Sequence, residues 1–201
     1  MSEARKVPRQ RRSRETVDTL LEAAAQMFTR EGLTTTTNRI AERAGLSVGT
    51  LYQYFPNKHA LLGAIAERHL AESAERLEAV FTELRTTRPD FEDTMRSILE
   101  AVVELHRDRP ALHALLHRVA PRMPGEAAAL QAFEDHLAAE VAFHLERCGR
   151  GGADPRYLAQ TLVHTIDAHL HRVLTRHRLD TDALMTLARQ IAAAPADQPS
   201  V

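Results

Sequence analysis

The chain has 201 residues, of which 44% are hydrophobic, and its formal net charge is −1 at neutral pH. This length and apolar fraction can build the core of one or two domains. The single cysteine, Cys148, excludes an intramolecular disulfide and is compatible with a reducing compartment. No long apolar run predicts a membrane span, and the polar start is unlike a secretory signal. We therefore expect a soluble, cytoplasmic protein without a membrane partner.

The charge is distributed unevenly along the chain. The first 60 residues hold ten Lys or Arg against six Asp or Glu, a balance of +4, whereas the remainder has a balance of −5. Six basic residues form an amino-terminal arm in which Glu3 is the one acidic residue: Arg5, Lys6, Arg9, Arg11, Arg12 and Arg14. Such an arm commonly follows a phosphate backbone, although a solvated start is the alternative, and we predict that residues 1–11 are disordered.

Helix-forming residues dominate the sequence, and no alternating run of β-branched or aromatic residues predicts a strand. The chain is therefore predicted to be all-α. Apolar periodicity, turn residues and prolines predict helices over residues 13–31, 36–44, 48–54, 58–85, 91–107, 111–119, 126–147, 156–177 and 181–191, followed by a disordered tail over 195–201. The long helix from residue 58 is the obvious link between the two halves.

Residues 36–55 read as two short helices joined by a tight turn. Thr36 is predicted to be the N-cap of the first helix, and Ser47 can cap the second through its hydroxyl group. Between them, Gly45 suits a position with positive φ, and Leu46 can pack the corner. This spacing predicts a helix-turn-helix, and an ordinary amphipathic helix pair is the alternative.

The second short helix predicts contacts with nucleic acid. Leu51 and Phe55 supply its inward face, because a helix this short needs packing to be stable. The other side chains are predicted to face outward: Val48, Gly49, Thr50, Tyr52, Gln53 and Tyr54. Gln53 can pair with an adenine edge, small apolar groups can meet thymine methyls, and Lys58 adds a positive charge after the following turn.

The run TTTTNRIAERAGLSVGTLYQYFPNKHALL, with the helix before it, resembles the tetracycline-repressor-like (TetR) family of bacterial transcriptional regulators. The resemblance combines an I-A-x-x-A-G-(apolar)-S helix and turn, a stretch ending in L-Y-x-Y-F, and an N-K pair that opens a long helix. It covers about residues 12–72, and the remainder matches the family in being helical and of suitable length. The resemblance implies a DNA-binding domain over 12–72 and an effector-binding and dimerisation domain over 73–194.

The resemblance also implies which residues meet DNA. Positions matching Thr37, Asn38, Val48, Gly49, Tyr52 and Gln53 lie against base edges in the family, and those matching Ser47, Thr50, Tyr54 and Lys58 lie against phosphates. Thr36 completes the predicted DNA-binding set. Asn38 is a neutral amide where some members carry a charge, which bears on the bases that are read there.

One helix-turn-helix contacts too little DNA for useful specificity, so we expect a homodimer on a palindromic operator in double-stranded DNA. The resemblance places the dimer contact on the last two long helices, at about residues 156–191. Val163 and Leu174 lie outside the main apolar stripe of the first of these helices and widen its apolar surface. A wholly intramolecular core is the alternative.

The family further implies a pocket in the carboxy-terminal half for a small, often hydrophobic effector. The candidate lining residues are Phe91, Met95, Leu99, His113, His117, Phe133, Leu137, His164 and Asp167. Plain core or surface placement is the alternative for each. The sequence alone leaves the effector, the operator and the sign of regulation open.

Histidine is unusually concentrated in this half, with nine of the eleven beyond residue 100. His113 and His117 are spaced i, i+4, while His164, Asp167 and His171 are spaced i, i+3, i+7, and both spacings could present ligands to a metal. No second local ligand cluster accompanies them, so we predict no metal and no cofactor, with ordinary helix-face histidines as the simpler interpretation.

The leading function is therefore a dimeric DNA-binding regulator, a repressor released by a small molecule, and not an enzyme. A helical metal-dependent enzyme or metal sensor that uses these histidines is the alternative, and an accessory DNA-organising protein without an effector is a third. The enzyme is disfavoured because no nucleophile, base and orienting group form a recognisable constellation.

Overall fold

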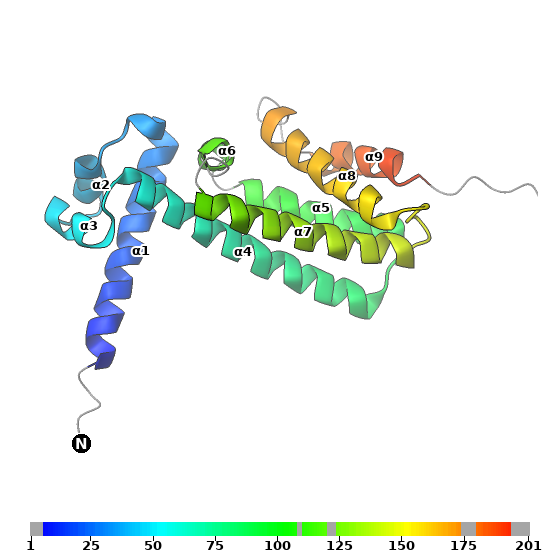
Figure 1. Cartoon of the computed structure of the whole chain (residues 1–201), viewed down its shortest axis with the longest axis horizontal. Coiled ribbons are helices and arrows are strands. Elements are labelled where there is room, and N and C mark those ends of the chain that lie inside the picture. The colour runs from blue at the N-terminus through cyan, green and yellow to red at the C-terminus, as the bar shows by residue number, and fades with distance from the viewer. Residues whose placement is uncertain (1–5, 108–109, 120–123, 174–179, 194–201) are drawn as a thin grey trace, which may run out of the picture. The chain divides into compact units, whose positions relative to one another are not determined.

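The computed structural model describes residues 6–107, 110–119, 124–173 and 180–193 (Figure 1). All regular elements in these ranges are helical and none is a strand, which confirms the all-α prediction. The elements form two compact units: residues 1–69 with 111–126, and residues 70–110 with 127–201. The division falls inside the long helix α4 (Lys58–Thr87), between His69 and Leu70. The tail predicted to be disordered, 195–201, lies outside the described residues.

The first unit packs two short helices, α2 (Thr37–Arg43) and α3 (Val48–Tyr54), on the long helix α1 (Lys6–Glu31). A short 3-10 turn, η1 (Gly32–Thr34), follows α1, and α6 (Pro110–Val119) adds leucines to the same core. The most deeply buried side chains of this core come from every helix of the unit except α6: Leu20, Ala24, Phe28, Ile40, Leu51, Leu61 and Leu62. These residues are the apolar positions that the helical spacing marks in the sequence.

Helix α1 begins at Lys6, not at residue 13 as predicted. The predicted disordered arm over 1–11 therefore overlaps with a helix from residue 6, and residues 1–5 lie outside the described part of the chain. Pro8 stands in the first turn of α1, where a backbone N–H has no acceptor within the helix, so proline is tolerated there. Arg11, Arg12 and Arg14 are exposed on this helix, and Arg11 pairs with Glu15 at 2.9 Å.

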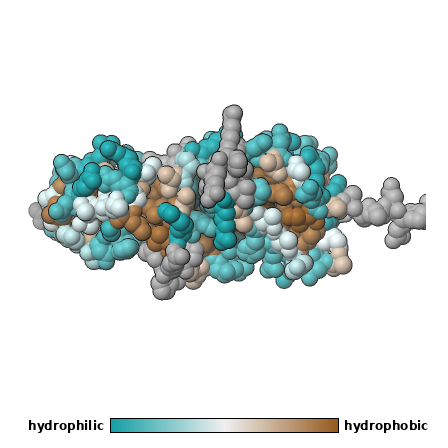
Figure 2. Space-filling model, turned by 90° about the horizontal axis from the view of Figure 1, so that it is seen from above, coloured by the Kyte–Doolittle hydropathy of each residue, from teal (hydrophilic) through white to brown (hydrophobic). Residues whose placement is uncertain are grey.

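The second unit is built from the rest of α4 with α5 (Phe91–Arg107), α7 (Pro124–Arg147), α8 (Pro155–Ala168) and α9 (Thr181–Ile191). Figure 1 shows α4, α5 and α7 running side by side, and their apolar faces share one core with α8 and α9. Exposed ion pairs tie α5 to α9: Arg189 to Glu92 at 2.6 Å and Arg96 to Asp182 at 3.0 Å. Hydrophobic residues also reach the surface of this unit between hydrophilic ones (Figure 2).

The helix predicted over 156–177 is not uniform. It is α-helical to Ala168 and continues as a π-helical segment, η3 (His169–Val173), while residues 174–177 lie outside the described ranges. The wider π turn was not visible in the sequence because Leu162, Ile166 and Leu170 keep an ordinary i, i+4 spacing and are all buried. The segment matters because it sets the direction of the side chains that follow Ala168.

A partly buried arginine joins α7 to the loop between α4 and α5. The guanidinium of Arg147 donates to the carbonyl of Pro89 at 2.6 Å and to Oγ1 of Thr94 at 2.8 Å. The preceding residue, Arg88, has a φ of +50°, a conformation that needs such support in a non-glycine residue. Arg147 therefore holds this turn in place, since one of its bonds satisfies a carbonyl of the loop and another reaches the first turn of α5.

His144 lies one turn before Arg147 and is only 1% exposed. Arg147 Nε donates to His144 Nδ1 at 3.4 Å, and the imidazole stacks on Phe81 with ring centroids 6.1 Å apart. Burial, assisted by the positive charge of Arg147, lowers the pKa of His144 to about 4. The ring is therefore neutral near pH 7, and its protonation is coupled to unfolding.

We predict that His144 makes the second unit less stable in mild acid. The unfolded chain takes up this proton below its ordinary pKa of 6.5, whereas the folded chain resists until about pH 4. The free energy of unfolding should thus be constant above this window and fall as the pH drops through it. Between about pH 7 and about pH 5, His144 should account for a loss of about 2 kcal/mol.

Urea denaturation of the wild type and His144→Leu at both pH values measures this loss. The variant should lose about that much less stability on acidification, because leucine does not titrate. Gln131→Ala, which removes an exposed side chain of α7 that does not titrate, is the control and should keep the wild-type pH dependence. Equal acid losses in the wild type and His144→Leu would contradict the prediction.

Candidate nucleic-acid interface

The turn between α2 and α3 is fixed by its backbone and by two capping side chains. Gly45 has a φ of +68°, its N–H donates to the carbonyl of Glu42 at 3.0 Å, and the N–H of Leu46 donates to the carbonyl of Ala41 at 2.9 Å. This pair of bonds is a Schellman motif, in which a glycine takes the left-handed position at the helix end. The predicted role of Gly45 is confirmed.

Both predicted N-caps are also confirmed. Oγ1 of Thr36 accepts a hydrogen bond from the N–H of Arg39 at 3.4 Å, and Oγ of Ser47 accepts one from the N–H of Thr50 at 3.0 Å. Each cap satisfies a backbone donor that has no partner within its helix. The start of α2 and the start of α3 are therefore both defined by residues visible in the sequence.

Ion pairs and hydrogen bonds at the surface hold α2 on α1. Arg39 contacts Glu31 at 2.7 Å, and Nε of Arg43 donates to Gln26 at 2.7 Å. Helix α3 is held differently, because Leu51 is fully buried and Phe55 is 8% exposed. Its other side thus remains available at the surface.

The exposed side of α3 carries four of the predicted base-reading residues. Val48 is 38% exposed and Tyr52 is 52% exposed, and Gly49 and Gln53 are exposed beside them. From α2, Asn38 is also exposed, and the hydroxyl of Thr37 lies 3.0 Å from the hydroxyl of Tyr52. The structure therefore brings residues from both short helices to one small, uncharged surface, which we name the α3 face: Thr37, Asn38, Val48, Gly49, Tyr52 and Gln53.

The residues predicted to meet phosphates are placed less uniformly. Ser47 and Thr50 lie at the start of α3 with their hydroxyl oxygens 2.8 Å apart. Tyr54 does not belong to the outward set as predicted, because it packs partly against the core and its hydroxyl accepts a hydrogen bond from Ser13 at 3.3 Å. The reason is helical spacing, since Tyr54 stands three residues after the buried Leu51 and shares its side of the helix.

Lys58 has a structural role that its sequence position did not reveal. Its ammonium group donates to the carbonyl of Leu33 at 2.6 Å and to that of Thr35 at 3.3 Å. Both carbonyls belong to the segment between α1 and α2. Lys58 thus holds the connection that leads into α2, and an ammonium has one further hydrogen to donate.

The nine residues proposed for an effector pocket lie in separate places. Five pack in or against the core of the second unit: Phe91, Met95, Leu99, Phe133 and Leu137. His113 and His117 belong to α6 in the first unit, where the ring of His113 meets that of His69 edge-on at 4.2 Å. His164 and Asp167 are on α8. The nine residues are therefore distributed over both units.

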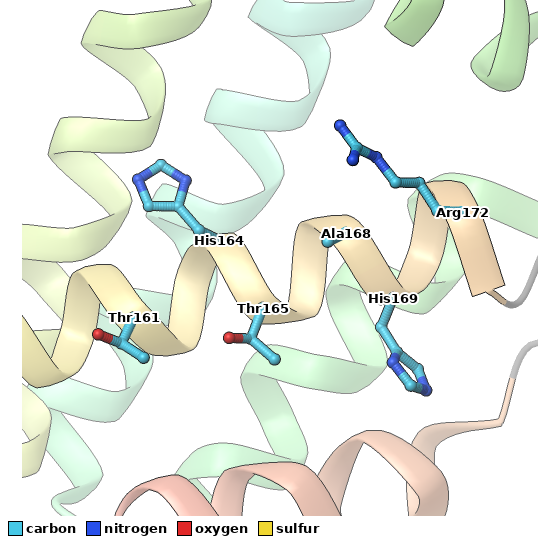
Figure 3. Close-up of a pocket in the computed structure, with 6 residues that line it drawn as sticks. All are labelled: Thr161, His164, Thr165, Ala168, His169 and Arg172. Atoms are coloured by element: carbon cyan, nitrogen blue, oxygen red, sulfur yellow. The ribbon is translucent and has the colours of Figure 1, made fainter.

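A shallow hollow of about 460 Å³ follows one side of α8 and η3. It is open to the surface and is lined by Thr161, His164, Thr165, Ala168, His169 and Arg172. Figure 3 shows His164 and Arg172 pointing from one edge of this row and His169 from the other. Of the nine predicted effector-binding residues, His164 alone lines this hollow.

The predicted row of His164, Asp167 and His171 is divided by the structure. His164 is exposed, whereas Oδ1 of Asp167 lies 3.3 Å from Nε2 of His171. His106, at the end of α5, contacts His171, with its Nε2 3.2 Å from that of His171. Spacing along the chain could not reveal His106, because the contact joins residues 65 positions apart. The high number of histidines in the carboxy-terminal half was the signal in the sequence that pointed to such a contact.

Two family models match the chain. The model described as "Bacterial regulatory proteins, tetR family" matches residues 20–65, and the model described as "Tetracyclin repressor-like, C-terminal domain" matches residues 90–194. The first match contains the turn, the caps and the α3 face. The second covers more than half of the chain and includes α5, α7, α8 and α9.

Curated relatives match over part of their length. The nucleoid occlusion factor SlmA of Actinobacillus pleuropneumoniae is 33% identical over 81 residues, which are 40% of this chain and 38% of that protein. An HTH-type transcriptional regulator of Mycobacterium tuberculosis is 32% identical over 121 residues, 59% of this chain and 57% of that protein. The chain therefore spans between about two fifths and three fifths of these relatives.

Solved structures match over almost the whole chain. SmeT, the repressor of the multidrug efflux pump SmeDEF of Stenotrophomonas maltophilia, is 27% identical with a TM-score of 0.64, over 92% of this chain and 93% of that one. The fatty acid degradation regulator FadR of Bacillus halodurans is 19% identical with a TM-score of 0.70, over 90% and 96%.

The amino-terminal match falls on a helix-turn-helix whose geometry is in place, and the carboxy-terminal match covers the helices of the second unit. No helix in the described part of the chain is long and apolar enough to cross a membrane. The chain belongs to the tetracycline-repressor-like (TetR) family of DNA-binding transcriptional regulators.

Proposed function

We propose that this chain is a homodimeric repressor that binds a palindromic operator in double-stranded DNA and is released by a small-molecule effector. The observation that carries the proposal is the α3 face, a small uncharged surface held outward by a buried leucine and two caps. Such a surface can enter the major groove of DNA, where side chains tell base pairs apart. The structural neighbour SmeT is described as a repressor, which supports repression as the proposed action of this chain.

Different residues of the first unit make different parts of the proposed contact with DNA. The amide of Gln53 suits the paired donor and acceptor of an adenine edge, and Val48 suits a thymine methyl group. The exposed arginines Arg12 and Arg14 on α1, with the remaining hydrogen of Lys58, supply charge for phosphate oxygens. Affinity should therefore depend on salt, whereas base preference should depend on the α3 face.

The dimer contact is proposed on α8, along the hollow that follows its side. Three of the lining residues are small or have short side chains: Thr161, Thr165 and Ala168. Short side chains allow two copies of a helix to approach closely in a two-fold contact, in which the same surface meets itself. Tyr157, at the start of α8, is 69% exposed and adds an aromatic group that a partner can cover.

The effector is proposed to enter the core of the second unit among Phe91, Met95, Leu99, Phe133 and Leu137, which pack together. Their apolar character suits a hydrophobic molecule. Release from DNA then requires that the effector bind more tightly to the arrangement of the dimer that cannot bind the operator. By linkage, the operator must weaken effector binding by the same factor by which the effector weakens operator binding.

We predict that Tyr52→Ala and Gln53→Ala each reduce the preference for the operator over random DNA. The loss should be about 1–3 kcal/mol per residue, because each removes contacts to base edges. Fluorescence anisotropy with the operator, selected from the genome of the source organism, and with a random duplex of equal length measures both affinities.

Gln131→Ala is the matched control, because it removes an exposed glutamine from α7 in the other unit. It should leave both affinities unchanged. Should Tyr52→Ala and Gln53→Ala weaken operator and random duplex by the same factor, the α3 face would have no part in base reading and the proposal would fail.

We further predict that Ala168→Glu converts the dimer into a monomer. The substitution places a carboxylate from each copy in the proposed contact, where two like charges would face one another without water. Sedimentation velocity should show the loss of the dimer, and operator affinity should fall because one helix-turn-helix then binds alone.

Ala139→Glu is the control for this experiment, since it makes the same change at an exposed alanine of α7. It should remain dimeric. A dimer that survives Ala168→Glu, with circular dichroism unchanged, would place the contact elsewhere.

A further inference from the structure

The imidazole of His144 carries a buried hydrogen-bond donor in the second unit. Its side chain is 1% exposed, and its Nδ1 accepts a hydrogen bond from Nε of Arg147 at 3.4 Å. A ring nitrogen that accepts has no hydrogen of its own, so the ring is neutral and its single hydrogen is on Nε2. This Nε2 is buried and has no hydrogen-bond partner among the residues that the structure describes.

The aromatic neighbours of His144 do not supply the missing acceptor. The imidazole stacks on Phe81, with ring centroids 6.1 Å apart and 22° between the planes, and the ring of Phe143 meets it edge-on at 5.1 Å. Neither phenyl ring has a lone pair. Buried N–H groups in folded proteins nearly always have an acceptor, because an unpaired one destabilises the fold. We therefore expect the acceptor to come from a bound molecule.

His144 lies on the face of α7 along which the effector is proposed to bind. Phe133, Leu137 and Val141 precede it by eleven, seven and three residues, a spacing that places all four on one side of the helix. Phe81, on which the imidazole stacks, belongs to the core against which Phe133 and Leu137 pack. These last two side chains are only partly buried, so a molecule that enters beside them can reach Nε2 of His144.

The surroundings of Nε2 favour an uncharged acceptor. The positive charge beside the ring belongs to Arg147, which donates at the opposite nitrogen, Nδ1. An anionic group at Nε2 would lose its hydration in an apolar core and would gain one neutral donor in return. A carbonyl oxygen loses less hydration, and a single N–H satisfies it.

We propose that the effector is an apolar molecule with one carbonyl-type oxygen, and that Nε2–H of His144 donates a hydrogen bond to this oxygen. This inference rests on the proposed effector site in the second unit and adds the class of ligand and the residue that recognises it. The new bond extends a chain of bonds from Nδ1 of His144 through Arg147 to the carbonyl of Pro89. Because neighbouring hydrogen bonds polarise one another, the ligand also strengthens the hold of Arg147 on the turn between α4 and α5.

The test compares two probes that share one carbon skeleton, with the full-length protein and without DNA. Propiophenone carries a carbonyl oxygen where propylbenzene has a methylene group, so the ratio of their affinities isolates the contribution of the oxygen. Isothermal titration calorimetry measures both dissociation constants. In His144→Leu the ratio should move against propiophenone by about tenfold or more, because leucine offers no donor to the oxygen.

Two further variants make the result specific. His144→Gln keeps an N–H near the position of Nε2, so it should recover most of the wild-type ratio. A merely structural role of the ring would not produce this rescue. His136→Leu is the matched control, because it makes the same change at an exposed histidine of α7, which lies 3.2 Å from Glu78. It should keep the wild-type ratio, and circular dichroism of each variant shows whether the fold is retained.

Nuclear magnetic resonance of protein labelled with nitrogen-15 at histidine adds a direct signature. The Nε2–H resonance that is missing in His144→Leu should move downfield with propiophenone and stay in place with propylbenzene.

Three results would overturn the proposal: neither probe binds the wild type, the ratio is unchanged in His144→Leu, or Nε2–H contacts a resident water that propiophenone does not displace. Because these titrations contain no DNA, a failure to bind or release the operator would count against the proposed function alone.

Discussion

The burial of Leu51 is the interaction on which the proposed DNA contact depends. Helix α3 has seven residues, and an isolated helix of this length is unstable in water, so packing must hold it. Leu51 is fully buried, and Ser47 satisfies a backbone donor at the other end of the same helix. Because these two residues fix α3 from one side, the residues on the opposite side can remain exposed and available to a partner.

Much of this arrangement could be predicted from the sequence because it is local. Thr36, Gly45 and Ser47 act through bonds to residues within five positions, and each was identified by residue type and spacing. Asp180 acts equally locally, since it caps α9 through a bond to the N–H of Asp182. Apolar periodicity similarly gave the order of the helices, since an apolar stripe at helical spacing marks the face that packs.

The features that could not be predicted from the sequence depend on contacts between residues that are distant along the chain. Lys58 was predicted to contact phosphate, and the structure adds bonds from its ammonium group to the carbonyls of Leu33 and Thr35, which no spacing rule connects with it. The contact between His106 and His171 is of the same kind, because the fold brings together two residues that are 65 positions apart in the sequence. Tyr54 is different, because its distance of three residues from Leu51 already placed it on the buried side, and its polar hydroxyl group masked that signal.

The bond between the hydroxyls of Thr37 and Tyr52 limits what the α3 face can offer a base. Two hydroxyl groups carry two hydrogens, and the bond between them uses one, so only one hydrogen remains for an outside acceptor. Whether this remaining hydrogen lies on the oxygen of Thr37 or on that of Tyr52 depends on both residues. Under the proposed function, the preference at this position is thus a property of the pair, and a tyrosine in the same place beside a different neighbour would read DNA differently.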